Sequence, residues 1–393
     1  MIQKTPKMSL MRSLSLYYQL FGILMAVLVA TTCWADDSSS AENTNTTAVT
    51  FRAWGEETLD LIERDFRMPD SNSYYEDHKR DQIAFTWGVF VLMKALSAAA
   101  QVDPQKYEER LTAFIADTDT YWDDNTNDIG GYDCLPMPKP TDRFYDDNAW
   151  MALALVDAYR VTENEAYLKR SRETLQFALS GEDDTHGGGI WWKETWKRQE
   201  LPRNKAVCST AGTALAAIEL YAETKEDALL EDGLRLLRWL ENTLQDKDGL
   251  FFNDIREDGS IGEYKWSYNT AVPLRCNLRL YQITGEEKYR DEALRIAQAA
   301  EKHWIDTDTG TIKCDSMFAF KLTDAWLQVY EMTKDAHWLG LVKRSLIHLR
   351  ENTRDSNGRY PKRWDQTAPE PLTEWNLLWP SANAHAFLRA SMY

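Results

Sequence analysis

Two kinds of helical segment alternate between residues 51 and 392 of the chain. Six segments are apolar on nearly all faces and rich in small residues: 83–100, 148–161, 206–223, 269–283, 318–332 and 381–392. Six others are charged and carry one apolar stripe: 51–66, 106–117, 165–179, 227–244, 287–303 and 336–351. A helix that is apolar all round belongs in an interior, whereas an amphipathic helix covers a core with one face. The pattern therefore predicts an inner and an outer set of helices in strict alternation.

The apolar segments resemble one another at their ends. Four of them finish with a tyrosine and, three residues later, a threonine: Tyr159 and Thr162, Tyr221 and Thr224, Tyr281 and Thr284, Tyr330 and Thr333. Self-similarity at a spacing of about fifty to sixty residues indicates a repeated helical hairpin. The connections after the apolar segments are short and those before them are long, so a closed ring would gather the long loops on one rim. We predict an all-α (α/α)6 barrel, with an open solenoid as the alternative.

The second apolar segment opens with two adjacent carboxylates, Asp146 and Asp147, after a long loop rich in Gly, Pro and Asp. In one interpretation, one of them caps the helix and the other offsets its dipole. In the other, both act on a glycosidic bond, which commonly needs one protonated and one ionised carboxyl group. Neighbouring like charges raise each other's proton affinity, and burial beside Tyr145 and Trp150 would raise it further. The pair is therefore the candidate catalytic site.

The starts of the other apolar segments carry residues suited to binding sugars. Sugar rings have apolar C–H faces and polar rims, and the side chains of Trp and Tyr combine an apolar body with a polar tip. Three glycines at 187–189 precede a tryptophan pair. They would let a sugar approach the backbone closely, although a tight turn with core packing explains the same residues. The candidate substrate-binding residues are Trp87, Tyr145, Asn148, Trp150, Trp191, Trp192, Asn204, Tyr268 and Asn269.

The N-terminus has the order of a secretory signal peptide. Three basic residues precede an apolar run at 20–30, and a small residue, Ala35, is followed at once by a polar stretch. We predict a signal peptide at 1–35, a disordered polar leader at 36–48 and a single catalytic domain at 49–393. An uncleaved anchor and a lipoprotein cleaved before Cys33 are the alternatives, but the apolar run is short for a membrane span. The mature protein is expected to be secreted or periplasmic, to have no membrane span and to be a monomer.

Charge and cysteine spacing narrow the class of partner. The chain has a formal net charge of −17, and the predicted signal peptide contains three basic and no acidic residues, so its removal makes the charge more negative. Such a chain repels phosphate backbones and acidic polysaccharides, so we expect a neutral polysaccharide and not a nucleic acid as the partner. The four cysteines that remain form no Cys-x-x-Cys pair, and buried free thiols are favoured over disulfides. No metal site and no cofactor are predicted.

Four short motifs follow one another along the chain. They are Tyr145-Asp146-Asp147-Asn148-Ala149-Trp150, Gly188-Gly189-Ile190-Trp191-Trp192, Arg203-Asn204 with Cys208-Ser209-Thr210, and Trp266-Ser267-Tyr268-Asn269. Together they resemble glycoside hydrolase family 76, over roughly residues 50 to 390. The resemblance implies an (α/α)6 barrel that cleaves the α-1,6-mannan backbone internally with retention, with Asp146 as nucleophile and Asp147 as acid/base. One position departs from the family: Thr270 stands where glutamine is expected, which bears on substrate or linkage preference.

Two other functions are compatible with the same toroid. A non-catalytic glycan-binding protein would share the cleft, but it would gain little from two adjacent negative charges. An isomerase of the sugar 2-epimerase type would need paired histidines for proton transfer, and His385 is the histidine found in an apolar segment. Hydrolysis of α-mannan is therefore the leading hypothesis.

Overall fold

The structure, a computed structural model, describes residues 36–197 and 203–393. The chain divides into two compact units, Met1–Thr50 and Phe51–Tyr393. The predicted signal peptide, residues 1–35, lies outside the described residues. Helix α2 (Asp36–Phe66) begins in the first unit, where it includes the predicted leader, and its residues from 51 onward belong to the second unit. The other described helices and strands also belong to the second unit.

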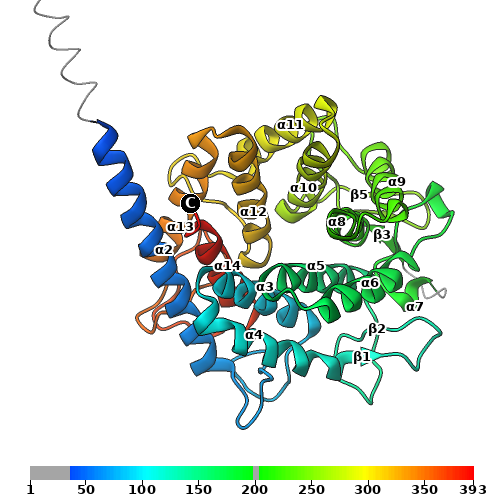
Figure 1. Cartoon of the computed structure of the whole chain (residues 1–393), viewed down its shortest axis with the longest axis horizontal. Helices are drawn as coiled ribbons and strands as arrows, with labels where there is room; N and C mark the ends of the chain where they lie inside the picture. Colours follow the sequence, from blue (N-terminus) through cyan, green and yellow to red (C-terminus); the bar gives the residue numbers. More distant parts are fainter. Residues whose placement is uncertain (1–35, 198–202) are drawn as a thin grey trace, which may run out of the picture. The chain divides into compact units, whose positions relative to one another are not determined.

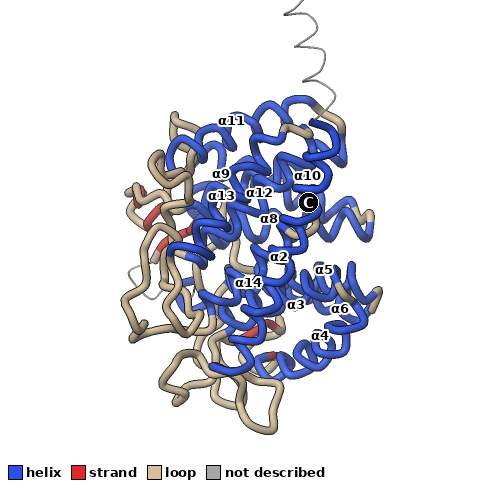
Figure 2. Tube along the Cα trace, turned by 90° about the vertical axis from the view of Figure 1, so that its left-hand side faces the viewer, coloured by secondary structure: helices blue, strands red, loops and turns tan. Residues whose placement is uncertain are grey.

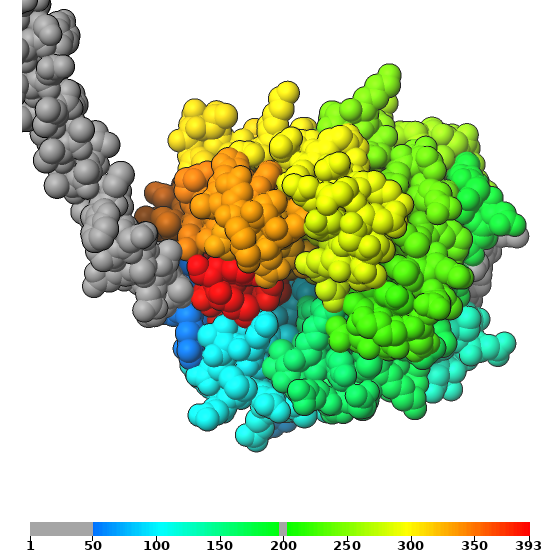
Figure 3. Space-filling view, turned by 45° about the horizontal axis from the view of Figure 1, so that its top comes forward, coloured from blue at the N-terminus to red at the C-terminus, as the bar shows by residue number. Residues whose placement is uncertain are grey.

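Six helices of the second unit form a closed inner ring (Figure 1): α3 (Thr86–Val102), α5 (Tyr145–Thr162), α8 (Val207–Thr224), α10 (Ser267–Thr284), α12 (Ser316–Thr333) and α14 (Leu378–Ala390). Each of them packs against the next, and α14 packs against α3. In Figure 3 the C-terminal segment (red) lies between the orange and the cyan segments, where the ring closes. The predicted (α/α)6 barrel is confirmed, because an open solenoid would leave its first and last inner helices apart.

Six amphipathic helices surround the ring: α2 from residue 51 onward, α4 (Pro104–Thr118), α6 (Glu165–Leu179), α9 (Asp227–Thr243), α11 (Glu287–Trp304) and α13 (Ala336–Asn352). In α9 the buried residues include Leu229, Gly233 and Leu240, which lie on one face. Gly233 lets α9 approach α8 closely, since a Cβ at this position would lie 2.5 Å from Cγ1 of Ile218. Hydrophobic periodicity therefore located these helices correctly.

The short connections after the inner helices share one structure. After α5, the hydroxyl of Thr162 donates a hydrogen bond of 2.9 Å to the carbonyl of Ala158 and accepts one of 3.3 Å from the N–H of Asn164. Between them, Glu163 adopts the left-handed conformation with φ of 55°. The same hydrogen bonds follow α8, α10 and α12, at Thr224, Thr284 and Thr333. The repeated threonine of the sequence therefore ends each helix and shapes the turn that follows.

The long connections precede the inner helices and contain short strands. Strands β1 (Trp122–Asp123) and β2 (Gly131–Tyr132) pair before α5, and β3 (Asn204–Ala206), β4 (Asp254–Arg256) and β5 (Ile261–Gly262) form an antiparallel sheet across the connections before α8 and α10. These connections also hold 3₁₀ turns at Asp119–Tyr121 and Thr185–Gly187 and the short helix α7 (Glu194–Lys197). In Figure 2 the loops gather on one side, as their lengths predict.

Several inner helices begin earlier than the apolar pattern indicates. Helix α5 begins at Tyr145, α10 at Ser267 and α12 at Ser316, whereas the apolar segments begin at 148, 269 and 318. Apolar periodicity misses these starts because the first turns are polar. The polar residues that matter for chemistry are therefore held by helical backbone and not by the loops before it.

The four cysteines of the second unit are buried and free: Cys134, Cys208, Cys276 and Cys314. Buried thiols of this kind pack as small apolar side chains, which agrees with the sequence-based prediction. Among the described helices, none is both long and apolar enough to cross a membrane.

Candidate active site

Asp146 and Asp147 lie in the first turn of α5, and neither caps the helix. The N-cap residue is Phe144, which has φ of −91°, ψ of 130° and no side-chain capping hydrogen bond. The capping interpretation of the pair is therefore wrong. The positive end of the helix dipole still favours negative charge here, and both side chains are half-buried beside each other.

Neighbouring residues hold this turn in place and are themselves buried. The N–H of Tyr145 donates to the carbonyl of Trp192 at 2.9 Å, and its ring stacks on Phe177 with centroids 5.0 Å apart. The side chain of Asn148 exchanges hydrogen bonds of 2.7 and 2.9 Å with the backbone of Tyr132 in β2. Tyr145 and Asn148 were predicted to bind substrate, but they are 1% and 0% exposed and instead support the turn.

One oxygen of Asp146 is held, and the other is left without a partner. Oδ2 accepts a hydrogen bond of 3.1 Å from the indole N–H of Trp192, and the thiol of Cys208 lies close enough to lower the pKa of the carboxyl group. Oδ1 is buried and has no hydrogen-bond partner among the described residues. Burial raises the pKa of Asp146, and these two neighbouring side chains together with the charge of Lys321 oppose that rise. The carboxylate is thus oriented while one oxygen stays available.

Asp147 has the more strongly raised pKa of the pair. Burial raises the pKa of Asp147 well above its usual value, and the negative charge of Asp146 raises it further. The charge of Lys321 opposes this rise without cancelling it. Two neighbouring carboxylates resist double ionisation. Asp147 is therefore the member that favours the proton, and Asp146 is the member that favours the ionised form.

Lys321 is a site residue that the sequence analysis did not identify. It lies on α12 and is 5% exposed, and its Nζ is 3.1 Å from the ring centroid of Trp150 and 5.3 Å from that of Tyr268. Burial lowers the pKa of the amine well below its usual value, and the negative charge of Asp146 opposes that effect. A lysine within the apolar segment 318–332 is the sequence signal for such a role, because a buried charge needs a partner.

Among the predicted substrate-binding residues, Trp192 contacts Asp146, and Trp150 and Tyr268 lie beside Lys321. Burial raises the pKa of Tyr268, and the nearby Cys208 and Asp146 raise it further, so the three side chains are close neighbours. The rings of Tyr268 and Trp87 both contact Phe318, at centroid distances of 4.4 and 6.1 Å. The structure thus brings together aromatic rings from α3, α5, α10 and α12 with Trp192 from the long connection before α8.

Of three other predicted residues, Trp191 and Asn269 are buried, whereas Asn204 is half-buried. Trp191 is fully buried, and its indole N–H donates to Asp183 at 2.8 Å, so it supports its connection and does not face a ligand. Asn269 is 1% exposed and donates to the side chain of Asn253 at 3.0 Å. Asn204 lies in β3. Asn204 and Asn269 each keep a buried amide oxygen that has no hydrogen-bond partner among the described residues.

Thr270, the residue that departs from the family pattern, has a structural role. It is fully buried, and its hydroxyl accepts a hydrogen bond of 3.3 Å from the N–H of Phe251. At the equivalent place in α8, Thr210 accepts one of 3.0 Å from the N–H of Ile190. The repeat therefore uses both threonines to tie a long connection to the helix start, and neither faces a ligand.

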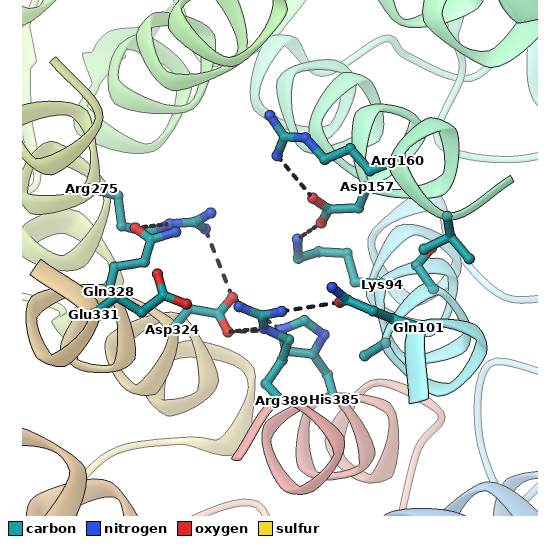
Figure 4. Close-up of a pocket in the computed structure, with 13 residues that line it drawn as sticks. Lys94, Gln101, Asp157, Arg160, Arg275, Asp324, Gln328, Glu331, His385 and Arg389 are labelled. Carbon is teal, nitrogen blue, oxygen red and sulfur yellow. Dashed lines mark hydrogen bonds and ion pairs between the residues drawn. The ribbon is translucent and has the colours of Figure 1, made fainter. Parts of the chain in front are cut away.

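A second cluster of charged residues lies toward the opposite end of the inner helices (Figure 4). It borders a cavity of about 250 Å³ lined from α3, α5, α10, α12 and α14. The ion pairs in and beside this cluster include Lys94 with Asp157, Arg160 with Glu219, and His385 with Asp324. The cationic partners lower the pKa of each of these three carboxyl groups despite their burial. Each of these three acids is paired with a base, so the cluster is a network of ion pairs that links the inner helices.

Comparisons with known proteins place this geometry in a family. The model for glycosyl hydrolase family 76 matches residues 68–324. A family 76 α-mannanase of Bacteroides thetaiotaomicron is 33% identical, with 87% of this chain and 95% of that chain covered and a TM-score of 0.84. An inactive variant of a Salegentibacter α-1,6-mannanase, with two adjacent aspartates changed to asparagine and α-1,6-mannotriose bound, is 19% identical with a TM-score of 0.73, covering 87% and 99% of the two chains.

A curated relative covers a smaller part of the chain. The meiotically up-regulated gene 191 protein of Schizosaccharomyces pombe is 23% identical over 206 residues, which are 50% of this chain and 46% of that protein. The chain thus spans about half the length of this relative. The family model matches well over half of the chain, at residues 68–324. A carboxylate pair in the first turn of an inner helix, on a closed barrel shared with family 76 structures, leads to the same conclusion: the chain belongs to glycosyl hydrolase family 76.

Proposed function

We propose that this protein hydrolyses α-1,6-mannan internally with retention of configuration, using Asp146 as the nucleophile and Asp147 as the acid/base. The observation that carries the proposal is the unequal environment of two adjacent carboxyl groups in one helical turn. A retaining glycosidase needs an ionised nucleophile and a protonated acid at the same pH. The pKa of Asp147 is raised by its burial and by Asp146, whereas donors and a nearby amine restrain the pKa of Asp146.

The chemistry follows from the two roles. In the first step Oδ1 of Asp146 bonds to the anomeric carbon, the glycosidic C–O bond breaks, and Asp147 gives its proton to the departing oxygen. In the second step Asp147 takes a proton from water, and the water oxygen displaces Asp146 from the anomeric carbon. Oδ1 is the attacking atom because Oδ2 is held by Trp192, while Oδ1 has no partner among the described residues.

The substrate class rests on charge and on relatives. A formal net charge of −17 disfavours anionic polymers and leaves neutral glycans. The α-mannanase at 33% identity favours a mannan, and the bound α-1,6-mannotriose of the Salegentibacter relative favours the α-1,6 linkage. Export through a signal peptide at 1–35 and action as a monomer are parts of the same proposal.

The isomerase alternative finds no support at the carboxylate pair. It needs histidines that exchange a substrate proton, and the inner-helix histidine, His385, is bonded to Asp324 in the cluster at the other end of the ring. The two aspartates are also an unfavourable surface for a protein that only binds neutral glycans, because each raises the cost of ionising the other.

The experiment is product analysis after incubation of the mature protein with linear α-1,6-mannan. Asp146→Asn and Asp147→Asn run beside the wild type, with Asp291→Asn, an exposed residue of α11, as the matched control. We expect short manno-oligosaccharides from the wild type and the control, and NMR should find the new reducing ends first in the α configuration. No release by the wild type contradicts the substrate, and full turnover by either active-site variant removes that residue from the mechanism.

A further inference from the structure

Two exposed aromatic side chains lie side by side on the connection that leads into α10. Tyr264 is 74% exposed and Trp266 is 37% exposed. Their ring centroids are 6.3 Å apart, and the ring planes are 11° from parallel. Single exposed apolar residues are common on protein surfaces, but neighbouring ones that stay hydrated without packing into a core mark binding surfaces. This pair, called the outer aromatic pair, therefore points to a ligand.

The backbone holds the outer aromatic pair in a fixed position. The chain leaves β5 and reaches Trp266 with φ of −98° and ψ of 145°, which is extended. In an extended chain, residues two apart point to the same side, which explains why Tyr264 and Trp266 are neighbours. Lys265 between them points to the other side, where its amine pairs with Asp246 and Asp248. Rings on an anchored segment lose little freedom when a ligand binds.

A row of rings connects the outer aromatic pair to the carboxylates. The ring of Trp266 lies 5.3 Å from that of Phe318, and Phe318 stacks on Tyr268 at 4.4 Å with planes 10° apart. Tyr268 lies near Cys208 and Asp146, which raise the pKa of its hydroxyl beyond the effect of burial. Tyr264 is 74% exposed and Trp266 is 37% exposed, whereas Phe318 is 7% exposed and Tyr268 is half-buried. The row thus begins in solvent and ends at the candidate nucleophile.

We propose that Tyr264 and Trp266 form an outer subsite that stacks against one hexopyranose unit of a neutral glycan whose scissile linkage lies at Asp146 and Asp147. This inference rests on the proposed function. The flat C–H face of a pyranose matches an aromatic ring that has one side in solvent. Because the pair lies at the solvent end of the row, the unit it holds is away from the bond that breaks. The outer subsite therefore sets the preference for long chains and takes no part in the chemistry.

Stacking on the outer aromatic pair does not depend on the charged residues beside it. The two acids beneath the segment, Asp246 and Asp248, are paired with Lys265. An ionic polymer would therefore meet no free partner in this pair of acids, whereas stacking needs no charge.

The test compares substrates that do and do not reach the outer subsite. Values of kcat/KM are measured for α-1,6-mannan, for α-1,6-linked manno-oligosaccharides of increasing length, and for a short aryl α-mannoside. For Tyr264→Ala and for Trp266→Ala we expect kcat/KM on the polymer to fall about tenfold through KM, with a much smaller change on the aryl mannoside. Tyr264→Phe keeps the ring and should retain the wild-type ratio of long to short substrate.

Two controls separate the subsite from damage to the fold. Tyr264 is 74% exposed, so its replacement leaves the core intact. Tyr281→Ala removes a half-buried tyrosine at the far end of α10 and should leave both rates unchanged. An equal fall on long and short substrates, or an unchanged rate of Tyr264→Ala on the polymer, overturns the outer subsite.

A binding measurement keeps the inference testable if the wild type does not cut α-1,6-mannan. Asp146→Asn, with and without Tyr264→Ala, is then titrated with soluble α-mannan, β-glucan and xylan. A Tyr264-dependent affinity for one of them supports the outer subsite although the proposed substrate fails. Equal affinities with and without Tyr264, or no binding to any of the three, overturn it.

Discussion

The carboxyl groups at the two ends of the inner ring have opposite pKa shifts, and helix α5 carries carboxyl groups at both ends. Near its start, the pKa values of Asp146 and Asp147 are raised. Near its end, the pKa of Asp157 is lowered. Burial raises the pKa at both ends, so burial does not explain the difference. The difference in pKa depends on whether each carboxylate has a cation beside it.

The partners of each group account for the contrast. At the far end, Asp157 lies beside Lys94 and Arg160, and Glu219 beside Arg160 and Arg279 (Figure 4 shows the first two pairs). At the other end the two adjacent aspartates share the influence of one buried lysine, whose own pKa is lowered. Helix polarity acts the other way, since helix starts favour anions and helix ends favour cations by about 0.3–1 kcal/mol. The lack of a matching cation at Asp146 and Asp147 outweighs this effect of the helix dipole. At the two ends of α5, the acids without a matching cation form the candidate catalytic pair, and the acid with matching cations belongs to a structural cluster.

The largest effect should come from removing the nucleophile. Asp146→Asn keeps the size of the side chain but cannot form the glycosyl intermediate, so kcat should fall on the order of 10⁴-fold. The rate is measured on α-1,6-mannan, and circular dichroism checks that the fold is intact. A loss of less than tenfold would show that Asp146 is not the nucleophile.

The next largest effect should come from breaking the ion pairs of Arg160 near the end of α5. Arg160→Ala leaves Glu219 and Asp157 short of a partner, and the free energy of unfolding should fall by about 2–4 kcal/mol, reduced somewhat because Arg160 is one-third exposed. Urea denaturation measures this change. Arg290→Ala, at an exposed pair of α11, is the control and should change little.

The ion-paired acids near the end of α5 should also make the stability of the protein sensitive to low pH. The folded pKa values of Asp157, Glu219 and Asp324 are lowered. Their contribution to stability is therefore present above the unfolded pKa values and is lost as the pH falls through the folded values. The wild type should lose stability in acid more steeply than Arg160→Ala, and equal slopes would contradict the matching argument.

A smaller effect, an increase in the free energy of unfolding, is expected when one carboxyl group of the Asp146 and Asp147 pair is removed. Asp147→Asn removes one of two repelling carboxyls, so it should abolish turnover yet raise the free energy of unfolding by about 1 kcal/mol at pH 7. Because the folded pKa of Asp147 is raised, the wild type loses stability as the pH rises from the unfolded to the folded value. The gain should therefore vanish near pH 4. Unfolding curves at the two pH values measure it, and a destabilised variant at pH 7 would contradict the unmatched-charge argument.

The smallest effect concerns Lys321. Lys321→Met removes the charge that opposes the rise in the pKa of Asp146, so the acidic limb of the pH profile of kcat/KM should move to higher pH. Lys313→Met, at an exposed position of the connection that precedes α12, is the control. An unmoved acidic limb would show that Lys321 packs against Trp150 without acting on the carboxylate pair.

The sequence by itself determined the helical repeat, the inner and outer sets and the candidate pair Asp146 and Asp147. These follow from local patterns: periodicity, repeated helix ends and adjacent acids, which are readable because neighbours in the chain are neighbours in a helix. Only the tertiary structure decided ring closure, where α14 meets α3. It also buried Trp191 and Asn148, which support the site and do not face a ligand. It brought Lys321 against the ring of Trp150, from a helix far along the chain. Contacts of this kind, and the pKa values that depend on them, are set by packing between distant segments, which no local pattern records.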